Sequence, residues 1–196
     1  VAVVYAAIAW LSLQLARRPD GASPLYFGAG LALACALRYG WPALAGVALG
    51  ALGAVALTRG AQVIAEPRLT AIWCVFALGA PLQAWVGAAL VRRFVPGPLT
   101  LAEPLDIALF LLLGAPVACL TGASLAALVL GAAGIVPGEA LAARWWLWWM
   151  GDTVGVLNGA PIVLSLIGLP RADWERRRLT LGLPLAAFDR RWRAWI

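Results

Sequence analysis

Few side chains in this chain could do chemistry, and the best placed of them stand inside apolar stretches. Asp152 follows a tryptophan cluster and precedes an uncharged run that ends at Leu169. An ionised carboxylate inside a bilayer is costly, so a residue of this kind usually has a polar partner or a function. We therefore take Asp152 as the strongest candidate for a signal or ligand contact. A structural role, through hydrogen bonds from a neighbouring helix or a pair with an arginine, is the alternative.

Two further amides lie in apolar runs. Gln83 follows Pro81 closely, and its position favours a buried hydrogen bond between helices, with a polar pocket as the alternative. Asn158 comes six residues after Asp152, so on one helix the two side chains project from different faces. Asp152 and Asn158 are therefore not expected to form one site.

Small residues recur at a spacing of four, which places them on one face of a helix. At this spacing they let helix backbones approach closely, and this packing drives association inside lipid. Interior glycines could also line a ligand cavity, and Gly151 and Gly155 beside Asp152 are candidates for either role. The two sets are Gly46, Gly50 and Ala54, and Gly151, Gly155 and Gly159.

A cluster of four tryptophans precedes Asp152. Tryptophan is enriched at the boundary between lipid headgroups and hydrocarbon, so the cluster predicts the point where a helix enters a bilayer. A platform for an aromatic ligand is the alternative. The cluster consists of Trp145, Trp146, Trp148 and Trp149.

No catalytic constellation emerges from the sequence. The chain has no histidine, which removes the commonest metal ligand and proton carrier. Its cysteines stand singly in apolar runs, where a buried packing thiol is the ordinary role; they are Cys35, Cys74 and Cys119. We predict no catalytic residue, no metal site and no cofactor, and hence no enzyme activity in these residues.

The composition predicts an all-α, polytopic transmembrane bundle of six to eight helices, some short or kinked. Hydrophobic residues make up 63% of the chain and charged residues 12%, and the mean hydropathy is +0.89. The net charge of +6 comes from arginines, which orient membrane proteins and contact anionic lipid headgroups. Lipids are therefore the expected partners, and nucleic acid is not.

The apolar runs and their charged or proline boundaries divide the chain into spans. Residues 1–170 form one predicted membrane domain, and residues 171–196 form a basic interfacial segment or the start of a further helix. Pro81 should kink the fourth span. The fifth run is too long for one untilted span and too short for two, with a natural break at Gly114-Ala115-Pro116. The predicted spans are 1–16, 24–37, 41–58, 69–90, 106–136 and 144–169.

Several segments together resemble the MASE-one (membrane-associated sensor one) domains of bacterial signalling proteins. The most specific is Trp148 to Leu157, which is similar to the family's Trp-Trp-x-Gly-Asp-x-x-Gly-x-Leu signature. The others are the proline-led segment Ser23 to Leu33, the turn Arg38 to Pro42 followed by Gly46 and Gly50, and the acid-led apolar helix Asp106 to Leu113.

This resemblance implies a multi-pass domain of the bacterial cytoplasmic (inner) membrane. In relatives the domain is fused to histidine kinase, diguanylate cyclase or cyclic-di-GMP phosphodiesterase modules. The implied function is to receive a membrane or small-ligand signal and to bias such an output module. The alternative is a non-catalytic accessory or scaffold subunit of a larger membrane complex.

Overall fold

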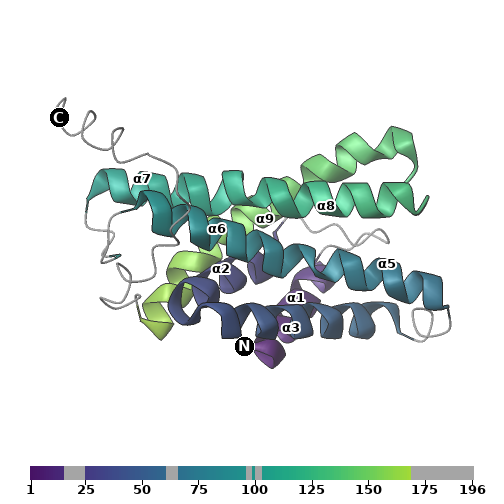
Figure 1. Ribbon diagram of the computed structural model, residues 1–196, viewed down its shortest axis with the longest axis horizontal. Coiled ribbons are helices and arrows are strands. Elements are labelled where there is room, and N and C mark those ends of the chain that lie inside the picture. Colours follow the sequence, from purple (N-terminus) through teal and green to yellow (C-terminus); the bar gives the residue numbers. More distant parts are fainter. Residues whose placement is uncertain (16–24, 61–65, 96–98, 100–102, 169–196) are drawn as a thin grey trace.

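The computed structural model of the protein is helical throughout the residues it describes, which are 1–15, 25–60, 66–95, 99 and 103–168. This confirms the predicted all-α bundle (Figure 1). Four of its helical segments are long and apolar enough to cross a membrane, and two are shorter. The predicted segment 171–196 lies outside the described residues. The elements are α1 (Ala2–Leu15), α2 (Phe27–Tyr39), α3 (Trp41–Arg59), α5 (Pro67–Ala77), α6 (Gly79–Phe94), α7 (Pro104–Leu112), the π-helical turn η1 (Leu113–Val117), α8 (Ala118–Ala132) and α9 (Gly138–Ile167).

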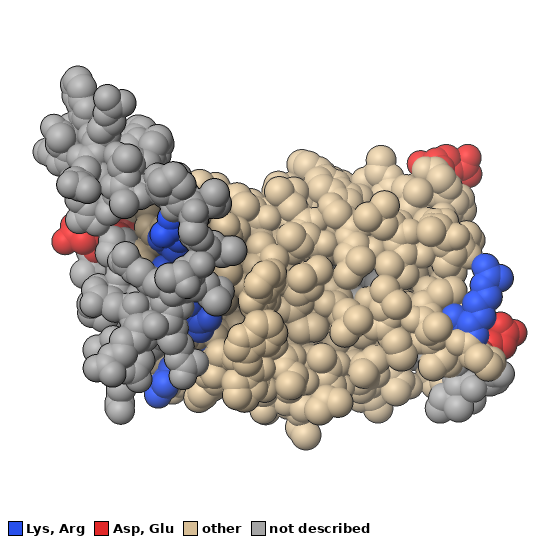
Figure 2. Space-filling model, viewed as in Figure 1, with Lys and Arg blue, Asp and Glu red and all other residues tan. Residues whose placement is uncertain are grey.

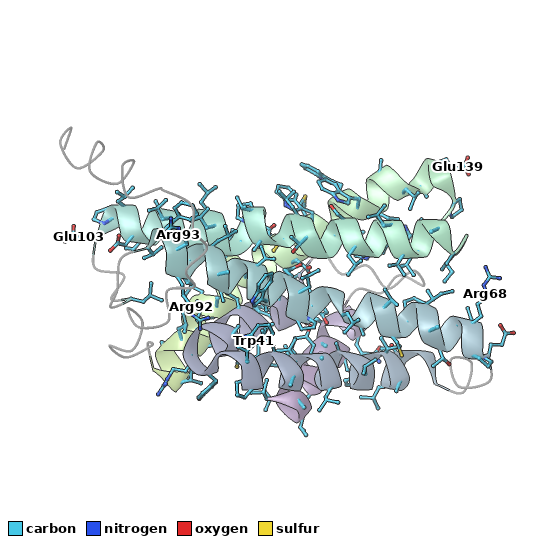
Figure 3. The ribbon with its side chains drawn as sticks, viewed as in Figure 1. Trp41, Arg68, Arg92, Arg93, Glu103 and Glu139 are labelled. Carbon is cyan, nitrogen blue, oxygen red and sulfur yellow. The ribbon has the colours of Figure 1, made fainter. Side chains whose placement is uncertain are left out.

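On the face drawn in Figure 2, the described charges gather at the two ends of the bundle. Figure 2 shows basic and acidic residues at both ends of the long axis and an uncharged belt between them. Arg92, Arg93 and Glu103 lie at one end, and Arg68 and Glu139 lie at the other (Figure 3). Large apolar side chains are exposed on several helices. A surface of this kind suits contact with lipid, where charge is confined to the two interfaces.

Helix α2 is short and lies inside the bundle. Its ten residues from Gly28 to Leu37 are all buried, as expected for a helix that is apolar on every side. It packs against α1, α3, α6 and α9. At 13 residues it is roughly 20 Å long, too short to cross a bilayer. The start of α2 therefore lies within the bundle.

The two prolines singled out in the sequence alter their helices in different ways. The helix from Pro67 to Phe94 is interrupted at Leu78, between α5 and α6, three residues before Pro81, which has no N–H to continue the helical bonding. Pro116 lies inside the π-helical turn η1, and the chain continues as helix on both sides. Residues Pro104–Ala132 thus form one continuous helix of 29 residues, long and apolar enough for a single span. The break expected at Gly114-Ala115-Pro116 was therefore wrong, because the π-helical turn accommodates Pro116 without ending the helix.

Helix α9 begins earlier than the sequence predicted. It starts at Gly138, directly after Pro137, and runs for 30 residues. The expected start near Arg144 was wrong because Glu139 and the alanines that follow favour the first turns of a helix. Asp152 consequently lies halfway along α9 instead of one turn from its beginning.

Glycines allow two pairs of helices to pack at very short distances. A Cβ atom at Gly30 of α2 would lie 2.5 Å from the Gly155 carbonyl oxygen and 2.8 Å from the Gly159 Cα of α9. On α3, a Cβ atom at Gly50 would lie 2.6 Å from the Ala2 carbonyl oxygen of α1. Backbone therefore meets backbone at both interfaces, and any side chain there would force the helices apart.

A matched pair of glycine variants tests this packing. Gly30→Ala should lower the free energy of unfolding by about 1–3 kcal/mol, because the added carbon has no free space. Gly53→Ala on α3 should raise it by about 0.5–1 kcal/mol, because its Cβ would meet only Ala6 at an ordinary 3.5 Å. Denaturation of the detergent-solubilised protein measures both. Equal free energies would contradict the close approach of α2 and α9.

Candidate functional site

Asp152 and Gln83 come together in the interior of the bundle, although they lie on different helices and far apart in sequence. The Gln83 amide on α6 lies close enough to the Asp152 carboxylate on α9 to interact with it. Its Nε2 also donates to the Cys119 Sγ of α8 at 3.4 Å. Gln83 is only 5% exposed. The two polar groups that the sequence analysis treated separately thus form one cluster where α6, α8 and α9 meet.

Gly122 of α8 provides the space in which these side chains meet. A Cβ atom at this position would overlap the Gln83 Oε1 and would lie 3.5 Å from the Asp152 Oδ2. The Gln83 Oε1 is buried and has no hydrogen-bond partner. Two acceptor oxygens therefore face the Gly122 Cα.

Two tyrosines extend the cluster towards α1 and α2. The Tyr5 hydroxyl on α1 lies 3.3 Å from the Tyr26 hydroxyl, which belongs to the residue just before α2. Both rings are close enough to Asp152 to interact with its charge. The Tyr26 N–H donates to the Gly151 carbonyl oxygen at 3.0 Å. The start of α2 is therefore tied to α9 at the residue adjacent to Asp152.

Gly155 holds this junction together from the next turn of α9. A Cβ atom at Gly155 would overlap the carbonyl oxygen of Tyr26 and would lie 3.2 Å from the backbone nitrogen of Phe27. No other residue type fits there without moving the start of α2. Gly151 and Gly155 thus contact the same short stretch of backbone.

The other end of α2 is held by an arginine. The Arg92 guanidinium of α6 donates to the carbonyl oxygens of Ala36 at 2.7 Å and of Leu37 at 3.1 Å. These carbonyls belong to the last turn of α2, where a positive charge interacts favourably with the helix dipole; the Ala36 oxygen also accepts the Gly40 N–H at 3.0 Å. Helix α2 therefore links the polar cluster to the charged end of the bundle at Arg92 and Arg93 (Figure 3).

The tryptophans of α9 make contacts that the sequence did not indicate. The Trp149 indole N–H donates to the Pro116 carbonyl oxygen of η1 at 2.8 Å, and the Trp145 indole donates to the Ser124 hydroxyl at 3.1 Å. The rings of Trp145 and Trp149 stack at 6.2 Å, and Trp146 is 53% exposed. Placement of Trp145, Trp146, Trp148 and Trp149 at a membrane interface stays a prediction, but two of them also join α9 to α8 and η1.

The remaining candidates fall outside the cluster or at its edge. Asn158 is exposed and donates to the Val154 carbonyl oxygen of its own helix at 2.8 Å. Cys35 and Cys119 are buried, whereas Cys74 is exposed, so the expected packing role is wrong for Cys74. The sequence offered no signal for Tyr5, Tyr26 or Gly122. Among the described residues, no three histidine, cysteine or acidic side chains gather as a metal site would require.

These features define a multi-pass helical membrane domain whose polar cluster lies where a buried half-length helix begins. The chain belongs to the MASE1 family, whose model matches residues 1–188. Comparison with curated proteins found no match, and comparison with solved structures found none either. MASE1 domains are membrane-associated sensor domains, so this chain is a membrane sensory domain.

A double-mutant cycle tests the contact between Gln83 and Asp152. Gln83→Met and Asp152→Ala should each destabilise the domain, and the pair should show a coupling free energy of about 0.6–1.7 kcal/mol, the range for hydrogen bonds between membrane helices. Unfolding of the purified domain in detergent measures all four proteins.

The control cycle pairs Asp152→Ala with Asn158→Ala, whose side chain bonds only within α9. These two changes should add to within about 0.5 kcal/mol. Additivity of the Gln83 and Asp152 changes as well would show that the two side chains do not interact.

Proposed function

We propose that this domain is the signal-input part of a bacterial signalling protein in the cytoplasmic membrane. It receives a membrane or small-ligand signal and passes it to an attached kinase or cyclase module. Membership of the MASE1 family over residues 1–188 is the observation that carries this proposal. The polar cluster around Asp152 supports it, because an ionisable group deep in a membrane domain is a default candidate for function.

The contacts of α2 suggest how a change at Asp152 would be transmitted. The Tyr26 N–H bonds to the carbonyl next to Asp152, so a shift of the acid displaces the start of α2. The helix is buried along its length, and Arg92 holds its last turn. A rigid buried helix moves as a unit, because packed interiors do not deform smoothly. Motion at the cluster would thus reach the charged end of the bundle.

The signalling role is tested by removing the charge of Asp152 and keeping its shape. In the full-length protein, Asp152→Asn should change the activity of the output module at least several-fold, while the amount of folded protein in the membrane stays similar. The matched control is Asp106→Asn, which removes a carboxylate in the first turn of α7 and should leave the output unchanged.

The experiment also separates sensing from an accessory role. Output activity, membrane content and co-purification with other membrane proteins are measured in the same preparations. Unchanged output together with loss of a co-purifying complex in Asp152→Asn would contradict the sensory proposal and support the scaffold subunit.

A further inference from the structure

The polar cluster contains more acceptors than donors on the side that faces Gly122. The Gln83 Oε1 has no hydrogen-bond partner although the residue is 95% buried, since only 5% of it is exposed. The Asp152 Oδ2 points to the same place, because a Cβ atom at Gly122 would lie 3.5 Å from it and would overlap the Gln83 oxygen. A buried acceptor without a donor is destabilising. Two such oxygens facing one space favour a positively charged or proton-bearing species between them.

No cationic side chain supplies that charge among the described residues. Asp152 is half-buried, and the described group that acts on its carboxylate is the Gln83 amide. The titratable groups nearest to it are Tyr5 from α1, Tyr26 before α2 and Cys119 from α8, all of which are neutral in their ordinary state. An ionised carboxylate inside a membrane domain requires a compensating charge or must take up a proton.

We propose that the Asp152 carboxylate and the Gln83 Oε1, which both lie over Gly122, form a binding site for one monovalent cation, H⁺ or Na⁺. A proton on Asp152 converts one of the two acceptors into a donor, so that the acid can bond to the Gln83 carbonyl oxygen. Na⁺ would instead be held by both oxygens, which are ligands of the hard type that such a cation prefers. Either cation neutralises the carboxylate without any other residue.

The site lies beside the element that could respond to it. Asp152 follows Gly151, whose carbonyl oxygen accepts the Tyr26 N–H, and Tyr26 also faces Tyr5. Release of the cation would leave a charged acid next to the start of α2, where helix dipoles and free N–H groups favour negative charge. The cation would therefore shift the position of α2 relative to α9. The idea that the cation acts as a signal rests on the proposed function, whereas the existence of the binding site does not.

Infrared difference spectroscopy of the purified domain in lipid nanodiscs tests the site directly. Spectra of the wild type and of Asp152→Asn are compared at several pH values, in choline chloride and in NaCl. If the bound cation is a proton, a carbonyl stretch of a protonated acid should appear at neutral pH, disappear on alkalinisation and be absent from Asp152→Asn. If Na⁺ binds, replacing choline by Na⁺ should convert that band into a carboxylate band.

Gly122→Ala places a methyl group where the Gln83 Oε1 now lies and so displaces it from Asp152. This should raise the proton or Na⁺ concentration for half occupancy by about tenfold or more, as expected for loss of one hydrogen bond to an acid. Gly79→Ala on α6 is the matched control, because its Cβ would meet other atoms only at 3.8 Å or beyond, and it should leave the value unchanged. Should Gly122→Ala fail to fold, Gln83→Met serves the same purpose.

An Asp152 carboxylate band at every pH, with no response to Na⁺, would overturn the cation site, because the acid would then have a fixed counter-charge. That result leaves the signalling proposal intact if Asp152→Asn still changes output. Conversely, a titrating Asp152 in a full-length protein whose output ignores the substitution would support the cation site and contradict the signalling role.

Discussion

The carboxylate of Asp152 is the group around which the rest of this domain is arranged. It sits halfway along the longest helix, in a bundle whose described charges otherwise lie at the two ends (Figure 2). An acid in that position is tolerated only if other helices bring polar groups to it. Gln83 comes from α6 and Cys119 from α8, and Tyr5 and Tyr26 bring hydroxyls from α1 and from the start of α2. One acid therefore ties together five helical elements.

The second determinant of the architecture is the placement of small residues. The start of α2 reaches Asp152 because Gly155 leaves room for the Tyr26 backbone and Gly30 leaves room for α9. Leu33 of α2 fits against Gly87 and Gly114, where added Cβ atoms would lie 3.0 and 2.9 Å from its methyl groups. These contacts bury α2 on every side. A half-length helix can thus be held in a membrane domain, with its N-terminus in the polar cluster and its C-terminus bonded to Arg92.

Much of the fold could be predicted from the sequence, because hydrophobic length and charged boundaries are local properties. The helical bundle, the short second helix and the interruption near Pro81 follow from such local rules. The break expected at Gly114-Ala115-Pro116 was wrong, because the π-helical turn accommodates Pro116 within one continuous helix. Four segments, of which Trp148 to Leu157 is the most specific, also indicated the family, and the family match over residues 1–188 confirms it. The start of α9 was misplaced, because the tryptophans were taken as its beginning although the six residues from Glu139 to Arg144, all good helix formers, precede them.

Only the polar residues of the site could be predicted from the sequence, and their contacts could not. Asp152 and Gln83 stood out singly, because each is polar in an apolar run. Their contact depends on how α6, α8 and α9 pack, and no spacing along one chain segment encodes that. The sequence gives no signal for Gly122, because this residue matters only through its lack of a side chain beside the Gln83 Oε1 and the Asp152 Oδ2. Tyr5 and Tyr26 lie 21 positions apart and pair only after α1 and α2 have folded together.

The central claim is that the half-buried Asp152 side chain faces Gln83 and not the lipid. Solid-state NMR of the domain in lipid bilayers measures this most directly, through transfer between the labelled Asp152 carboxyl carbon and the labelled Gln83 amide nitrogen. The account predicts a clear transfer signal between the two groups and none between Asp152 and lipid acyl chains. A carboxyl carbon that contacts acyl chains and gives no signal to Gln83 would contradict it.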